Sequence, residues 1–296
     1  MIQSINYPFI KAVLMILTII NTSDLYSQNP NFDDNVSEWV GKEIFFIPID
    51  TSSILEPYSS WSLSPIKNIT PYPSQIYGRK GIITDVKKDD HFDPYFVTID
   101  LVESDTTLYA ISFNGHLPDV GFSNDFEKAL KLTGAILWNN RSMFYTFDSV
   151  LAYEKPQAVT NLEPLFLWKI EWSNDSQKPI RLIFFEPGGR KVFINMNFSE
   201  LNLSPESPPL YIENVFHQVN PRLTHPDWKE KLWIKIESET IVKRMSREAV
   251  LLSWGEPISF ANHKEKDNLI EIWNYDRDPP VTVKFKNGLL EDWKTN

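Results

Sequence analysis

The dipeptide Asn287-Gly288 separates two runs in which apolar and polar residues alternate, and it constrains the fold more than any other feature of the chain. Asn-Gly favours a two-residue type I′ turn, whose twist matches that of two antiparallel strands. The sequence therefore predicts a β-hairpin formed by residues 281–286 and 289–293.

A two-residue turn also fixes which side chains face each other across the hairpin. It places Phe285 opposite Leu290 and Lys284 opposite Glu291. We expect the apolar pair to face a core and the charged pair to form an ion pair in solvent. Because Lys284, Lys286 and Glu291 alternate on the exposed side, they are our candidate residues for contact with a partner.

A short helix and a further strand are expected before this hairpin. Ser246 is the predicted N-cap, because its side chain can accept a hydrogen bond from the first turn of a helix. Met245 can pack on Val250, and Gly255 can adopt the left-handed conformation that ends a helix. Residues 269–275 then have the composition of a strand.

Together these signals form one pattern, which consists of Met245, Ser246, Val250, Trp254, Gly255, Pro257, Trp273, Tyr275, Phe285, Asn287 and Gly288. The pattern resembles the SmpA/OmlA family, which includes the small lipoprotein of the outer-membrane β-barrel assembly machinery and whose fold is similar to β-lactamase inhibitory protein. The resemblance implies two helices packed on a three-stranded antiparallel sheet, in a non-catalytic unit that contacts partners. Arg244 stands where the family often has glycine, and the chain has no cysteine to carry a lipid anchor.

Before this unit, short runs of aromatic and β-branched residues predict many strands, so the expected fold is mainly β with a final α+β domain. We assign residues 36–133 and 134–204 to two β-rich modules of SH3-like barrel type, and residues 210–296 to the C-terminal domain. The runs follow a similar order in both modules, which suggests an internal duplication. Chance alignment of two β-rich segments is the alternative explanation.

Two further helices are expected outside these strands. Residues 124–132 carry apolar residues at helical spacing between the two modules. Trp228, Leu232 and Ile236 fall on one face of a second helix, for which Pro226 suits the first turn.

The N-terminus resembles a secretory signal peptide, which we assign to residues 1–27. Lys11 precedes an apolar run at residues 12–20, which is shorter than the ~20 residues that cross a bilayer, so no transmembrane segment is expected in the mature chain. Export without any cysteine favours a bacterial cell envelope, with a periplasmic protein or one held at the outer membrane by its partners. The net charge of −10 argues against nucleic acid as a ligand.

Reactive side chains form few patterns that point to chemistry. The densest group of possible metal ligands or acid–base residues consists of Asp89, Asp90, His91 and Asp93, although a polar hairpin loop explains it as well. His217 and His225 lack metal-ligand spacing, and we interpret them as surface or capping residues. We therefore assign no catalytic, cofactor-binding or metal-binding residue and expect no enzyme.

The ten Trp residues raise the possibility of sugar stacking. Five of them lie inside strand or helix patterns and are expected in the core: Trp138, Trp168, Trp172, Trp254 and Trp273. Trp61 lies within a Ser- and Pro-rich stretch at residues 51–75 that predicts a surface loop. It is therefore the tryptophan that we expect to be exposed and available to a partner.

These observations favour a non-catalytic, exported envelope protein that binds a protein or a cell-wall component, as in outer-membrane assembly or maintenance. An enzyme acting on cell-wall or other polysaccharide, using the carboxylates near His91, is one alternative. A proteinaceous inhibitor of another envelope enzyme is a second alternative, suggested by the fold similarity alone.

Overall fold

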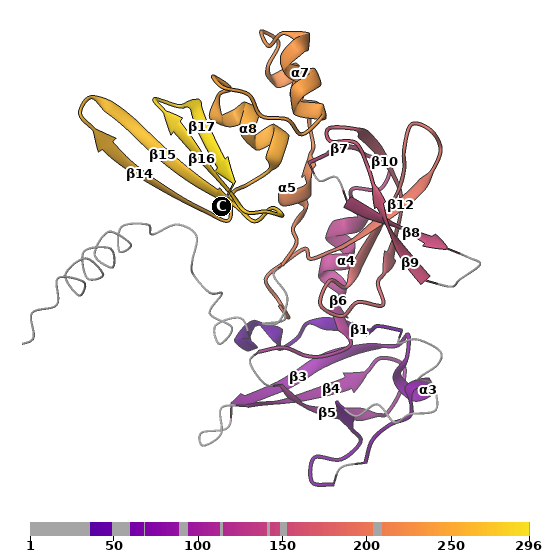
Figure 1. Cartoon of the computed structure of the whole chain (residues 1–296). Helices are drawn as coiled ribbons and strands as arrows, with labels where there is room; N and C mark the ends of the chain where they lie inside the picture. Colours follow the sequence, from indigo (N-terminus) through magenta and orange to yellow (C-terminus); the bar gives the residue numbers. More distant parts are fainter. Residues whose placement is uncertain are drawn as a thin grey trace, which may run out of the picture.

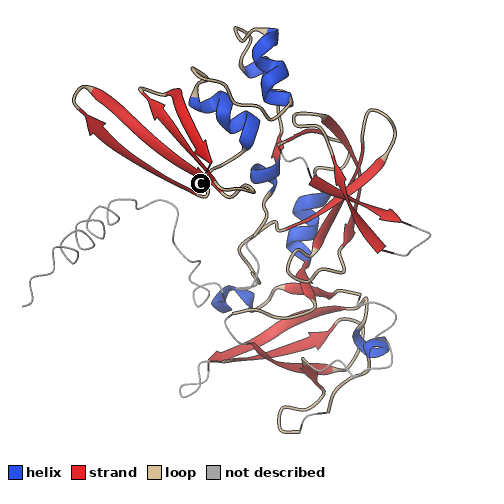
Figure 2. Cartoon of the chain, viewed as in Figure 1, coloured by secondary structure: helices blue, strands red, loops and turns tan. Residues whose placement is uncertain are grey.

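The computed structural model describes residues 36–48, 60–67, 69–88, 94–112, 115–140, 143–148, 153–203 and 209–295. The predicted signal peptide and the acidic cluster at residues 89–93 lie outside these residues. The described chain is mainly β, as predicted, and it forms three antiparallel sheets (Figures 1 and 2).

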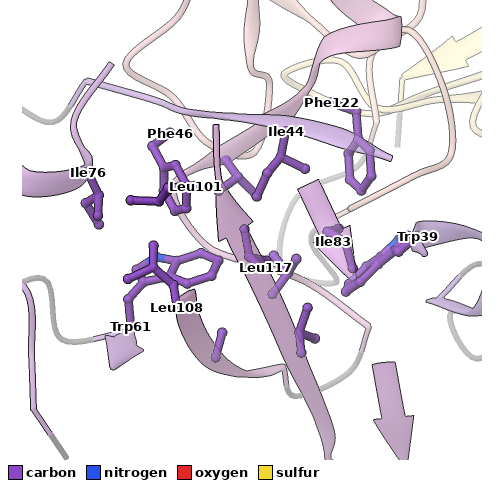
Figure 3. Packing of buried hydrophobic residues seen from close by; sticks show 14 of the residues in the cluster. Trp39, Ile44, Phe46, Trp61, Ile76, Ile83, Leu101, Leu108, Leu117 and Phe122 are labelled. Carbon is purple, nitrogen blue, oxygen red and sulfur yellow. The ribbon is translucent and has the colours of Figure 1, made fainter. Parts of the chain in front are cut away.

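The first sheet has the strand order β2-β5-β4-β3-β1-β6. Its elements are η2 (Ser37–Trp39), β1 (Glu43–Phe46), β2 (Trp61–Ser62), α3 (Pro73–Ile76), β3 (Lys80–Lys88), β4 (Tyr95–Leu101), β5 (Thr107–Ser112) and β6 (Val120–Phe122). Buried and exposed residues alternate along β4, as expected for a strand with one covered face. Trp39 and Trp61 are the largest side chains of the core of this sheet, and Phe46 packs beside Trp61 (Figure 3).

The second sheet has the strand order β13-β7-β10-β11-β12-β8-β9. Its strands are β7 (Ile136–Asn139), β8 (Met143–Asp148), β9 (Tyr153–Ala158), β10 (Pro164–Trp172), β11 (Ile180–Phe185), β12 (Lys191–Met196) and β13 (Phe216–His217). Helices α4 (Ser123–Leu130) and α5 (Ile212–Val215) contribute side chains to its core. Residues 212–217 thus pack with the second sheet, although the sequence analysis assigned 210–296 to the C-terminal domain.

The two β-rich modules differ in how their strands are arranged. The run at β1 matches the run at β7 in sequence order, and the hairpin β4–β5 matches β10–β11. However, β7 pairs directly with β10, whereas β3 lies between β1 and β4. The strand order therefore does not support an internal duplication of an SH3-like barrel. The duplication stays a prediction.

The C-terminal domain consists of helices and a four-stranded sheet of order β14-β15-β16-β17. Its elements are α6 (Pro221–Thr224), α7 (Glu230–Glu237), α8 (Arg247–Trp254), β14 (Ser259–Glu265), β15 (Asn268–Tyr275), β16 (Val281–Lys286) and β17 (Leu289–Thr295). The expectation of three strands was wrong, because β14 adds an edge strand that the sequence pattern did not indicate. Helix α7 also begins later than expected: Trp228 precedes it, and Pro226 lies outside its first turn.

The local signals around α8 and the final hairpin are confirmed. The Ser246 hydroxyl accepts a hydrogen bond from the Ala249 amide at 3.2 Å, and Gly255 ends the helix with φ of 79°. Asn287 and Gly288 both have positive φ, as a type I′ turn requires.

The hairpin register is as predicted at the turn and shifts beyond it. Phe285 lies opposite Leu290, and both are buried. A bulge after Lys284 places Asp292 rather than Glu291 opposite it. The expected ion pair still forms, with 2.7 Å between Lys284 Nζ and Glu291 Oε2.

Trp172 joins the first module to the second. Its ring stacks on Phe45 of β1 with centroids 4.9 Å apart, and on Phe126 of α4 with centroids 4.5 Å apart. A Cβ added to Gly121 of β6 would lie 2.2 Å from the same ring. The Asn202 side chain of the second module makes a second connection. It accepts a hydrogen bond from the Leu117 amide and donates one to the Leu117 carbonyl oxygen.

The turn between β9 and β10 joins the second module to the C-terminal domain. Leu162 inserts into the core of the C-terminal domain, where it packs in the cluster that contains Trp233 and Phe285. The neighbouring Asn161 is buried and donates hydrogen bonds to the carbonyl oxygens of Ile236 at 3.1 Å and Leu252 at 2.6 Å. The three modules therefore form one connected structure.

Candidate partner-binding surfaces

Strand β14 forms an open edge of the C-terminal sheet. It pairs with β15 over its whole length on one side, and all seven of its residues are exposed. Figure 1 shows the β14–β15 hairpin extending away from helices α7 and α8. An exposed edge presents unpaired main-chain groups to which another chain can add a strand.

The predicted partner-contact residues lie on the same sheet. Lys284 alternates with the buried residues Val283 and Phe285, so it points to the face away from the core. The hydrogen bond between Lys284 and Glu291 raises the pKa of the lysine and lowers the pKa of the carboxyl. Lys286 is exposed at the end of the strand, whereas Lys284 and Glu291 are partly exposed.

An aromatic face covers the outer side of the second sheet. Phe166 lies opposite Ile136 on β7 and Phe185 on β11, which makes an apolar row across three strands. Trp168 is 43% exposed beside this row, and Lys191 Nζ lies 4.4 Å from its ring centroid. Antiparallel sheets usually expose polar residues on the solvated face, so an apolar outer face indicates an interaction surface.

The exposures of Trp61 and Trp168 correct the sequence analysis. Trp61, the predicted exposed tryptophan, is only 1% exposed, because β2 directs its ring into the first core, edge-on to Phe46 at 5.0 Å (Figure 3). Trp168, expected in the core, lies on the surface instead. The predicted exposure of Trp61 was therefore wrong, and Trp168 joins the candidate partner-contact residues.

The first sheet carries a groove of about 900 Å³ on the face opposite its core. Its lining includes Ile66, Lys67, Phe96, Tyr109 and Ile111. The floor comes from β4 and β5, and the wall is the loop that follows β2. The sequence signal for this groove is that Phe96 and Ile111, both apolar, occupy positions where alternation along β4 and β5 predicts a solvent-facing side chain.

A second cleft of about 540 Å³ lies between the segment after α5 and helix α8. It brings together His217 and His225, which we had interpreted as separate surface or capping residues, with Glu213, Glu248 and Glu256. Burial lowers the pKa of His217, and its Nε2 atom has no hydrogen-bond partner among the described residues. The three carboxylates make no ion pair with other described residues.

Within the described ranges, no group of three His, Asp or Glu side chains is placed to hold a metal ion. None of the described helices combines the length and apolar character needed to cross a membrane. The candidate sites of the described residues are therefore the open edge strand, the aromatic face, the groove and the cleft. The acidic cluster near His91 lies outside the described residues. Comparison with protein-family models, with curated proteins and with solved structures found no match to this chain.

Proposed function

We propose that this chain is a non-catalytic, exported protein of a bacterial cell envelope that binds an extended segment of a partner protein. The open edge strand β14 is the observation that carries this proposal. Main-chain hydrogen bonds to such an edge supply affinity for almost any extended sequence, and nearby side chains then select among partners.

The surroundings of β14 provide that selection. Lys264 and Glu265 lie at the end of the strand, and the ion pair of Lys284 with Glu291 lies on the same sheet. Charges at the rim of an interface affect specificity and association rate more than affinity. The resemblance to the SmpA/OmlA family supports the same conclusion, because it implies a unit that contacts partners without catalysis.

A crosslinking experiment tests the edge directly. A photoreactive residue at position 261 of a C-terminally tagged chain, expressed in the native host, should trap one or a few envelope proteins, to be identified by mass spectrometry. Asn262→Pro and His263→Pro remove adjacent main-chain N–H groups, one of which faces the open edge. We expect the edge-facing proline to abolish trapping while circular dichroism stays unchanged.

Matched alanine variants at the same two positions are the controls, because they keep the N–H groups and should keep the partner. Partner recovery that survives both proline substitutions would exclude the edge. Replacing Lys284, Lys286 and Glu291 together by Ala tests the face separately. If every trapped partner still bound, that face would have no role in binding.

A second function, recognition of a cell-wall glycan, is favoured by the aromatic face of the second sheet. Exposed rings such as Trp168 and Phe166 bind the apolar faces of pyranose rings. Cosedimentation of the full chain with purified cell-wall sacculi measures this binding. Trp168→Ala should weaken it, and Ile258→Ala, at an exposed apolar residue of the C-terminal domain, should not.

A further inference from the structure

The groove of the first module fits a ligand of a different class from either of these partners. We propose that it binds a small amphipathic carboxylate, an anion that carries an unbranched apolar chain. The inference rests on the floor, the wall and the charge of the groove, and it does not depend on the proposed function.

The floor of the groove is apolar where solvent would otherwise meet the sheet. Phe96 and Ile111 face each other across β4 and β5, and they are 44% and 48% exposed. The next pair on the same face of these strands is Thr98 with Tyr109. Two large apolar side chains beside a tyrosine give a narrow strip that a hydrocarbon chain can cover, which removes apolar surface from water.

The wall is a built loop held by the hydroxyl group of Ser62. This hydroxyl oxygen lies 2.8 and 2.9 Å from the carbonyl oxygens of Ser64 and Lys67, and its single proton can be donated to either of them. It also accepts from the amide of Ile69 at 3.2 Å, which ties both ends of the loop together. The loop presents Ile66 beside the floor with 91% of its surface exposed, an exposure that a bound apolar chain would reduce.

The charge of the groove selects the head group. Lys67 lines the groove and makes no ion pair with any described residue. Lys87 and Asp85, which also line it, pair with each other and cancel. Among the described residues that line the groove, Lys67 is thus the lysine without a carboxylate partner, and a ligand carboxylate that reached it would form a charge-assisted hydrogen bond.

The size of the groove agrees with a small molecule. Its volume of about 900 Å³ lies within the range of roughly 300–1,000 Å³ typical of small-ligand sites. A neutral hydrocarbon would leave Lys67 unused, and an apolar cation would be repelled by it. A carboxylate with an apolar chain can cover the apolar floor, contact Ile66 of the wall and pair with Lys67.

Isothermal titration calorimetry of the full chain with decanoate, below the concentration at which it forms micelles, tests the proposal. We expect binding of decanoate and none of decyltrimethylammonium. Lys67→Met, which removes the charge and keeps most of the unbranched apolar stem, should weaken binding about tenfold or more. Phe96→Ala should weaken it by a similar factor, and Lys80→Met, at a cation on the same sheet but paired with Glu43, should leave it unchanged.

Methyl resonances of Ile66 and Ile111 provide a second readout that needs no variant. Both should shift on addition of decanoate and stay in place on addition of the cationic analogue. Absence of decanoate binding, equal binding of both compounds, or affinity unaffected by both groove variants would overturn the proposal. Concentration-dependent shifts at these two residues without any ligand would identify a second copy of the chain as the occupant and overturn it as well.

Discussion

Trp172 makes the joint between the first two modules open to a quantitative test. Replacing it by alanine removes two stacked ring pairs, one with Phe45 and one with Phe126. Each such pair contributes about 0.5–1.5 kcal/mol beyond area burial. Tryptophan-to-alanine changes in cores cost about 3–5 kcal/mol in total. Because Trp172 is only partly buried, we expect a loss of about 3 kcal/mol in the free energy of unfolding.

Gly121→Ala disturbs the packing of the Trp172 ring from the side of β6. The new methyl group would lie 2.2 Å from the Trp172 ring, so the ring must move. Overpacking of this kind costs about 1–3 kcal/mol. In a Trp172→Ala background the ring is absent, so Gly121→Ala should lower the free energy of unfolding much less. A double-mutant cycle should therefore give a coupling energy of at least about 1 kcal/mol.

Urea unfolding followed by far-UV circular dichroism measures all four members of the cycle. Trp168→Ala is the matched control, since it removes the same residue type from the exposed face of the same strand, and it should cost less than about 1 kcal/mol. Additive losses within about 0.5 kcal/mol, or equal losses for the two tryptophan variants, would refute the proposed joint.

Three further predictions concern single side chains. Ser246→Ala should lower the free energy of unfolding by about 1 kcal/mol through loss of the α8 N-cap, whereas Ser246→Asp should retain most of it in the same urea assay. Asn161→Ala removes the donor to the buried Leu252 carbonyl and one of two donors to the Ile236 carbonyl, so it should cost about 1–3 kcal/mol, together with earlier proteolytic cleavage between the second module and the C-terminal domain. Burial lowers the pKa of His217 below its ordinary 6.5, so the unfolded chain binds this proton more readily and stability should fall as pH drops through 6.5. His217→Gln should make stability less dependent on pH between neutrality and about pH 5, and an unchanged pH dependence would contradict this assignment.

Signals that act on their immediate neighbours were read correctly from the sequence. Ser246, Gly255 and Asn287-Gly288 each specify main-chain geometry within a few residues. The N-cap hydrogen bond of Ser246 forms, and Gly255, Asn287 and Gly288 all have positive φ. The ion pair of Lys284 with Glu291 also forms. The bulge beside it carries no such signal, because it depends on how two strands twist together.

Edge strand β14 and the exposures of the tryptophans could not be predicted. The strand Ser259–Glu265 is polar along most of its length and has no buried face, so it lacks the alternation that marks a strand. Trp168 and Trp172 are four residues apart and would share one face of a regular strand. The register shift between Leu167 and Lys169 directs one ring outward and the other inward.

Alternation along a strand shows that its two faces differ, but it does not show what covers each of them. For that reason the groove floor at Phe96 and Ile111 could be recognised only once the loop around Ser62 was placed beside it. The cleft with His217 and His225 has the same origin, since its two sides come from segments that the sequence keeps apart.

The insertion of Leu162 into the C-terminal core limits how the parts of this chain can be exchanged during evolution. Leu162 adopts a positive φ of 59°, which is costly for a leucine and is held by the packing around it. A recombination event that moved residues 218–295 into another protein would leave behind a side chain that fills their core. The recipient would have to supply an equivalent leucine, so this domain and the turn at residues 160–163 are expected to be inherited together.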